Sequence, residues 1–415
     1  MTPFHTVLVC SPPRPWLYAV GVLVLLAAGP ARGQAPEVDG WDTGRWRFGP
    51  LAVTPTVELK NLGWDSNVFN ATEDAKSGFT TTVGAPIDWW LRFGRGRLHV
   101  VDYFEGVYFA NYPDQSGFNQ RHDVALLMPL RRLRPYVGGY YLSTNDRPGY
   151  EINARLRHAE TGVNGGAVVH LSSRLDLDLS GRQTTYEYDD EDYAGNPYST
   201  TLNHRTQAYG AQARYRVSSL TTLTLIADSL RERYTESPDR DNDGYRILPG
   251  VEFDPLALVK GKAQVGYRKL NAIAAGMPDF SGLVANVELS YVLLGTTRFA
   301  VGASRDVYVS YEIDEPFYVQ PGFTLSVTQQ MTGPWDVQAR GGWYRLSYRQ
   351  AAASDIASQP GRVDHYGVWG GGVGYRVGRD IRVGFNLDYV RRESVVPGQS
   401  YDGLRGGMAA TYAFK

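Results

Sequence analysis

The sequence has a single cysteine among its 415 residues, and long apolar segments are equally scarce. That cysteine, Cys10, lies in an N-terminal stretch that we expect to be removed, which excludes disulfide bonds and cysteine zinc sites from the mature chain. Beyond the N-terminus, no uninterrupted apolar run approaches the roughly 18 residues that a membrane-spanning helix needs. If the chain crosses a membrane, it must do so with β-strands.

An excess of charge of one sign is also lacking. The formal net charge is −1, with 42 Lys and Arg residues against 43 Asp and Glu residues. A nucleic-acid-binding protein normally has a basic face, so we expect no nucleic-acid partner. The seven histidines are scattered, and none pairs with a serine or an acid at a recognisable motif spacing. We therefore expect no enzyme activity and no catalytic, cofactor or metal site, with a hydrolase assembled across strands as a distant alternative.

The N-terminus has the pattern of a secretory signal peptide. Arg14 supplies positive charge, residues 16–28 are apolar, and Ala31-Arg32-Gly33 has small residues at the two positions that a signal peptidase reads. We expect residues 1–33 to be cleaved and residues 34–50 to form a short periplasmic segment. A segment of that length is too short for a plug domain, which disfavours energy-coupled uptake.

From about residue 51 onward, apolar and polar residues alternate with a period of two. Such alternation over about ten residues is typical of a strand that has lipid on one face and water on the other. A soluble all-β protein would alternate as well. Here, however, the pattern continues to Phe414 and leaves no second apolar element to cover so many apolar faces. Aromatic residues gather near the expected strand ends, as aromatic girdles at the two membrane interfaces would require.

Short and long connections alternate between these segments. Tight turns are expected near residues 94–96, 131–132, 172–173, 218–219, 257–258, 295–296, 332–333 and 378–379. Longer polar connections are expected near residues 63–78, 111–118, 145–152, 189–201, 236–244, 271–279, 314–316, 350–362 and 395–400. The sequence therefore predicts an all-β fold: a transmembrane, antiparallel, up-and-down β-barrel of about 18 strands over residues 51–415, in the bacterial outer membrane.

Charged residues recur on the polar face of the expected strands, where water makes them far less costly than lipid would. The predicted pore-lining residues are Asp88, Arg92, Asp176, Asp178, Arg182, Arg214, Glu252, Arg268, Glu288, Asp336, Arg340, Arg382 and Asp388. Their mixed signs suggest a transverse field across a wet pore, without strong selectivity for one ion. Pairing between them to brace the wall is the alternative, and both can hold.

A short motif closes the first expected strand. Asp65, Ser66 and Asn67, followed by Val68, resemble the D-S-N-V motif near the start of a family of outer-membrane proteins, the β-barrel porins of the second type. This family is often encoded near exopolysaccharide or capsule assembly genes. The resemblance implies an outer-membrane barrel of undefined substrate and carries over no catalytic residue. A loop-entry turn that caps its own backbone needs the same residue types, so that interpretation stays open.

The segment from Asp239 to Gly244 matches the first half of a calcium-loop pattern. Its twelfth position is Gly250 instead of the bidentate glutamate, which excludes a helix-loop-helix calcium site. A solvated acidic loop is the plainer interpretation, and a weak divalent-cation site is the alternative.

The leading functional hypothesis is a porin-like channel for diffusion or export of solutes, with saccharides among the candidates. The alternative is a non-conducting structural or assembly barrel of the outer membrane or of an exopolysaccharide export system. Expected partners are outer-membrane lipid and lipopolysaccharide, the barrel-insertion machinery and small solutes, and a homo-oligomer stays open. An inward-folded loop would narrow the channel, and residues 63–78 and 350–362 are the candidates for it.

Overall fold

The computed structural model describes residues 40–190, 192–193, 196–312, 314–352, 361–378 and 380–413. The signal peptide predicted for residues 1–33 lies outside these ranges, as do residues 34–39 of the predicted periplasmic segment. Within them, no helix is long and apolar enough to cross a membrane.

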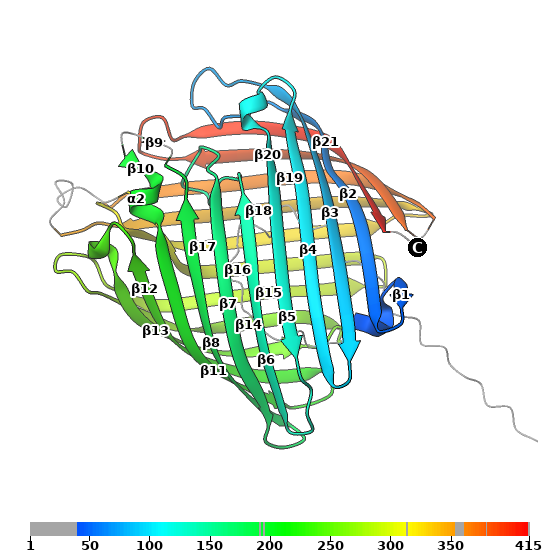
Figure 1. Ribbon diagram of the computed structural model, residues 1–415. Helices are drawn as coiled ribbons and strands as arrows, with labels where there is room; N and C mark the ends of the chain where they lie inside the picture. The colour runs from blue at the N-terminus through cyan, green and yellow to red at the C-terminus, as the bar shows by residue number, and fades with distance from the viewer. Residues whose placement is uncertain are drawn as a thin grey trace, which may run out of the picture. The chain divides into compact units, whose positions relative to one another are not determined.

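Eighteen antiparallel strands form one closed barrel, which confirms the predicted fold class and strand number (Figure 1). Each barrel strand pairs with the next one along the chain, and the first pairs with the last to close the ring. The strands are β2 (Leu51–Asp65), β3 (Gly78–Phe93), β4 (Gly96–Phe109), β5 (Gly117–Leu127), β6 (Leu133–Thr144), β7 (His158–His170), β8 (Leu175–Tyr188), β11 (His204–Arg216), β12 (Thr221–Tyr234), β13 (Asn242–Phe253), β14 (Val259–Ala272), β15 (Phe280–Leu293), β16 (Thr297–Val309), β17 (Phe317–Gln330), β18 (Trp335–Arg349), β19 (Val363–Val377), β20 (Ile381–Glu393) and β21 (Tyr401–Ala413).

Few other elements are present in the described residues. A short strand, β1 (Trp46–Phe48), pairs with the start of β2, and β9 (Asp192–Tyr193) pairs with β10 (Asn196–Pro197). The short helices are η2 (Gly40–Thr43), η3 (Pro113–Gln115), α2 (Tyr198–Leu202) and η4 (Pro238–Arg240).

The connections follow the predicted alternation. All eight predicted tight turns fall between paired strands at one end of the barrel, and the longer loops fall at the other. Several of the tight turns contain a glycine with positive φ, such as Gly94, Gly295 and Gly333. Glycine adopts this backbone conformation without the steric cost of a Cβ atom.

The period of two sorts the side chains onto two faces. On β15, for example, Leu283 is 64% exposed on the outer face while the adjacent Val284 is 2% exposed on the inner face. Adjacent aromatic residues near the strand ends, where we expected aromatic girdles, point to opposite faces in the same way. Trp343 is exposed on the outside and Tyr344 is buried inside, so only one member of such a pair can face lipid.

The D-S-N segment lies where the barrel closes. The backbone N–H of Ser66 donates to the Leu404 carbonyl (2.9 Å), and the Leu404 N–H donates to Ser66 Oγ (2.7 Å). The Asn67 side chain donates to the carbonyls of Asp402 and Ala71, both at 2.9 Å. These bonds join the end of the first barrel strand to the start of the last one.

Candidate functional site

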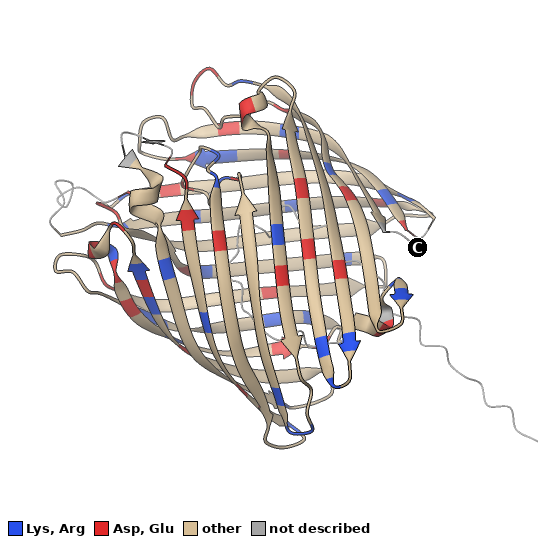
Figure 2. Cartoon of the chain, in the orientation of Figure 1, with Lys and Arg blue, Asp and Glu red and all other residues tan. Residues whose placement is uncertain are grey.

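All thirteen predicted pore-lining residues lie on the inner face of their strands, opposite the exposed apolar side chains. Figure 2 shows that charged positions occur along the strands themselves as well as in the loops. Whether these residues line a conducting pore stays a prediction.

Every one of the thirteen has a polar partner, and most of these partners lie on other strands. The contacts are Asp88 with His99 (3.2 Å), Arg92 with Asp42 (2.9 Å), Asp176 with His170 (2.7 Å), Asp178 with the Tyr136 hydroxyl (3.0 Å), Arg182 with Asp228 (3.8 Å), Arg214 with Glu252 (2.6 Å), Arg268 with Asp306 (2.7 Å), Glu288 with Lys262 (3.7 Å), Asp336 with Arg382 (2.6 Å) and Arg340 with Asp388 (2.5 Å). The wall charges therefore compensate one another over short distances.

One set of these contacts forms a continuous chain along the inner wall. Arg246 on β13 bonds to Asp228 on β12 and lies 4.0 Å from Asp306 on β16. Arg268 on β14 bridges Asp306 (2.7 Å) and Glu232 (3.6 Å). The signs alternate along this chain, so each buried charge on β12, β13, β14 and β16 lies beside an opposite charge.

The loop between β6 and β7, residues 145–157, enters the barrel. Its apolar side chains Tyr150, Ile152 and Leu156 are 4%, 4% and 0% exposed, which an external loop in water would not give. The Tyr150 ring lies 4.3 Å from the ring of Tyr366 and 4.6 Å from that of Tyr344, centre to centre. Those two tyrosines belong to β19 and β18, on the far side of the ring of strands from β6 and β7. The loop thus crosses the lumen, and we call it the crossing loop.

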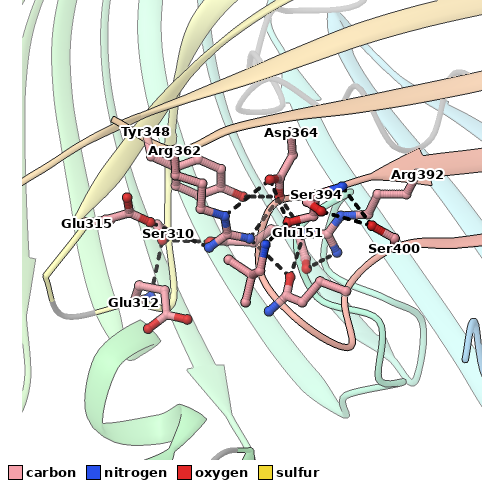
Figure 3. A network of polar contacts seen from close by, with 12 residues as sticks. Glu151, Ser310, Glu312, Glu315, Tyr348, Arg362, Asp364, Arg392, Ser394 and Ser400 are labelled. Carbon is pink, nitrogen blue, oxygen red and sulfur yellow. Dashed lines mark hydrogen bonds and ion pairs between the residues drawn. The ribbon is translucent and has the colours of Figure 1, made fainter. Parts of the chain in front are cut away.

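Polar contacts hold the crossing loop against the opposite wall, as Figure 3 shows. Arg392 on β20 donates to the Glu151 carbonyl (2.5 Å) and to Asn153 Oδ1 (2.9 Å). The Glu151 carboxylate accepts from Ser310 Oγ (2.7 Å) and from the Tyr311 N–H (3.2 Å). One loop residue therefore contacts β20 and the connection between β16 and β17.

Buried charges on the far wall complete this network. Asp364, which is 0% exposed, accepts from both Arg362 and Arg392 at 2.8 Å. Gln399 accepts from the same two arginines at 3.0 Å and 2.6 Å. Arg392 is 1% exposed, so its charge is fully enclosed and depends on these partners.

The connection between β16 and β17 also lies in the lumen. Arg240 of η4 donates to the carbonyls of Ser310 and Pro316, and to that of Thr201 in α2. Tyr311 packs with Ile152 and Leu156 of the crossing loop and with the apolar side of α2. Four segments that are distant in sequence, the crossing loop, α2, η4 and the β16–β17 connection, therefore meet over the outer part of the lumen.

Glu151, at the centre of this network, has a shifted pKa. Burial raises the pKa of Glu151 to about 7, although the hydrogen bond from Ser310 and the charge of Arg362 oppose the rise. Near neutral pH this carboxyl group is therefore poised between its charged and neutral forms.

The crossing loop is a segment that was not among the two candidates chosen from the sequence, residues 63–78 and 350–362. Residues 353–360, within one of them, lie outside the described residues. The other candidate supplies a contact but does not cross the barrel: Arg147 of the crossing loop donates to the Val68 carbonyl (2.7 Å). The glycine-rich, polar composition of the two candidates indicated only that they are long loops. The signal that could have identified the crossing loop is its set of apolar side chains, Tyr150, Ile152 and Leu156. The inward residues Asp364 and Arg392 were missed because they lie at the outer ends of their strands.

Carboxylates of the acidic segment 239–244 bind to groups of the protein itself. The Tyr234 N–H donates to Asp241 Oδ1 (2.7 Å), and Arg233 pairs with Asp243 (2.7 Å). Across the described ranges, no group of three or more His, Cys, Asp or Glu side chains is arranged to hold a metal ion.

Solved structures with a similar arrangement are outer-membrane proteins of low sequence identity. A BenF-like porin from Pseudomonas fluorescens Pf-5 has 14% identity, with 87% of this chain and 98% of that chain covered and a TM-score of 0.49. OpdK from Pseudomonas aeruginosa, solved with vanillate, has 12% identity, coverage of 87% and 98%, and a TM-score of 0.47. The FrpB iron transporter from Neisseria meningitidis has 9% identity, coverage of 91% and 83%, and a TM-score of 0.43.

No curated protein matches the chain. Residues 42–414, which include the whole described barrel, match the sequence profile of the family described as "Putative beta-barrel porin 2". The chain therefore belongs to this family and is a porin-like β-barrel of the bacterial outer membrane.

Proposed function

We propose that the protein is a narrow channel for small hydrophilic solutes, constricted in its outer part by the crossing loop. The observation that carries this proposal is an eighteen-strand wall with a charged inner face, spanned by the crossing loop. Barrels of about 16 to 18 strands are wide enough to leave an aqueous channel when wall side chains alone fill them. A loop across that width reduces the channel to a narrow passage.

Small saccharides are the solute class that this lumen suits best. The inner face carries partly exposed tyrosines such as Tyr103, Tyr140 and Tyr186, which offer flat apolar rings with a polar hydroxyl group. The paired wall charges leave little net field, so uncharged polar solutes would meet no large electrostatic barrier. No catalytic step belongs to this proposal.

A non-conducting structural barrel is the second candidate. The enclosure of Arg392 and Asp364 favours it, because a buried ion-pair network holds the crossing loop firmly in the lumen. In that case the barrel would serve as an anchor, and solute would not pass.

Swelling of proteoliposomes separates the two candidates. Vesicles that contain the folded protein should swell in arabinose and swell slowly or not at all in raffinose, which is a larger sugar. Replacement of residues 147–156 by a short Gly-Ser linker should admit raffinose. Failure of the folded wild-type protein to admit arabinose, with admission only after loop replacement, would favour the structural barrel.

A further inference from the structure

The outer wall of the barrel carries a hydrogen-bonded His–Asp pair on neighbouring strands. Asp102 on β4 and His122 on β5 lie directly opposite each other in the ladder, with 2.7 Å between Nδ1 of His122 and Oδ1 of Asp102. The indole N–H of Trp89 on β3 donates to the other carboxylate oxygen (2.9 Å). The ring of Tyr141 on β6 stacks beside that of His122, with 6.5 Å between the ring centres. We call these four residues the outer polar patch.

The outer polar patch faces away from the lumen. Phe118 and Val124, which share the face of His122 on β5, are 60% and 43% exposed. Tyr108, which shares the face of Asp102 on β4, is exposed as well. The side chains of Asp102 and His122 are themselves 22% and 33% exposed, so their neighbours do not close over them. The patch is therefore open to whatever surrounds the barrel.

The patch lies where the wall should meet the middle of the membrane. Asp102 and His122 are each at the centre of their strand, and Val100 and Phe104 continue the apolar outer face on either side of Asp102. Elsewhere in the described strands, the outward charged residues lie toward the loop ends, as Arg231 and Lys269 do. Charged groups on the lipid face destabilise a barrel most at the bilayer midplane. This position therefore calls for a polar neighbour outside the barrel.

The patch also has hydrogen-bonding capacity that the described chain leaves unused. No hydrogen bond within the described residues involves Nε2 of His122 or the hydroxyl group of Tyr141. The Asp102 carboxylate has lone pairs for more than the two bonds it accepts. Hydrocarbon tails offer neither donors nor acceptors. A surface that fits the patch must therefore supply both.

A second copy of the same patch meets this requirement. In a two-fold dimer the same surface of each chain faces the other, so the donors of one copy reach the acceptors of its partner. The apolar surroundings are compatible with this arrangement. Gly106, which has no side chain, lies opposite the projecting ring of Phe118 in the ladder, so two copies can interlock beside the polar groups.

We propose that the outer faces of β3 to β6, which lie side by side in the wall (Figure 1), form the interface of a homodimer within the membrane. The outer polar patch lies at its centre, where the Tyr141 hydroxyl group donates to the carboxylate of the partner's Asp102, and the bond repeats by symmetry. The interface is on the outside of the wall, so it does not depend on whether the lumen conducts.

Crosslinking between single cysteines tests the proposal on the full chain. Cleavage of the predicted signal peptide removes Cys10, so an introduced cysteine is the only one in the mature protein. Val124→Cys lies on the outer face next to His122, and Val265→Cys is the matched control, 50% exposed on the outer face of β14. A short bismaleimide, applied to outer membranes, should join Val124→Cys into a product of twice the mass and leave Val265→Cys as single chains.

Loss of the polar pair should weaken the dimer. Asp102→Leu with His122→Leu, combined with Val124→Cys, should lower the association constant measured by sedimentation in detergent by about tenfold, the effect of losing one or two hydrogen bonds. The crosslink yield should fall with it. Gln183→Leu with Gln207→Leu is the matched control, because it removes another outward hydrogen-bonded pair (2.8 Å) and should change neither measurement.

Three results would overturn the proposal. Equal crosslinking of Val124→Cys and Val265→Cys would indicate random collision, and a product of another mass would mean that a different protein covers this face. Unchanged association of the double leucine variant, with the gel mobility of a folded barrel, would show that the polar pair needs no partner. If that variant fails to fold, sedimentation of the wild-type protein decides, since a monomer at every concentration rules out the dimer.

Discussion

Arg392→Ala should release the crossing loop and widen the channel. Arg392 is 1% exposed and donates to the Glu151 carbonyl, Asn153, Asp364 and Gln399. Removal of one partner from a buried ion pair costs about 3–5 kcal/mol. Asp364 keeps its contact with Arg362 at 2.8 Å, so the lower end of that range applies. At about 1.4 kcal/mol for each tenfold change, the ratio of docked to undocked loop should fall by roughly a hundredfold.

Single-channel recording in planar bilayers measures this effect. The variant should show a larger conductance, or frequent steps to a larger level, while wild-type protein stays at the small level. Arg391→Ala is the matched control, because Arg391 pairs with Glu393 at 2.7 Å with both side chains more than half exposed. Exposed pairs of this kind contribute about 0–1 kcal/mol. Equal conductance in Arg392→Ala and wild type, with both barrels folded, would refute the assigned role of the loop.

Three further predictions concern charge and sidedness. Because burial raises the pKa of Glu151 to about 7, docking of the crossing loop should be strongest below about pH 4.5, weaken as pH rises toward 7 and stay weak above it. Single-channel conductance should therefore be higher at pH 8 than at pH 5. Glu151→Gln should abolish this difference. Arg382→Glu, which reverses the charge beside Asp336, should shift the reversal potential in a salt gradient toward cation selectivity, and an unchanged potential would mean that this position does not face the ion path. A tag inserted after Gly276, in the loop between β14 and β15, should be reachable by antibody on intact cells, whereas a tag after Gly295 should be hidden. The reverse pattern would mean that the barrel has the opposite orientation in the membrane.

The sequence contained enough information for the wall of the barrel. A period of two is a local property, so alternation such as that from Ile381 to Tyr389 specifies a strand and its two faces without knowledge of the neighbours. Turn residues such as Gly94 and Gly333 mark the ends of strands for a similarly local reason. Together they allowed the eighteen strands and their order to be predicted.

The interior depended on contacts that no local pattern contains. The crossing loop is held by Arg392, which lies 241 residues after Glu151 in the sequence, and nothing near either residue indicates the pairing. Nor does the sequence indicate that the ladder between β15 and β16 ends early, because Phe280 and Val307 continue the ordinary alternation of their strands. Only the missing ladder and the burial of Val319 reveal it.

The conductance of the purified wild-type barrel tests the central claim most directly. Protein that migrates faster on gels before heating than after it, as a closed barrel should, is added to a planar bilayer in potassium chloride solution. We predict stepwise insertions of one small, uniform conductance, which increases when residues 147–156 are replaced by a short linker. Folded wild-type protein that inserts and yet carries no current at any voltage or salt concentration would contradict the channel and favour a structural barrel.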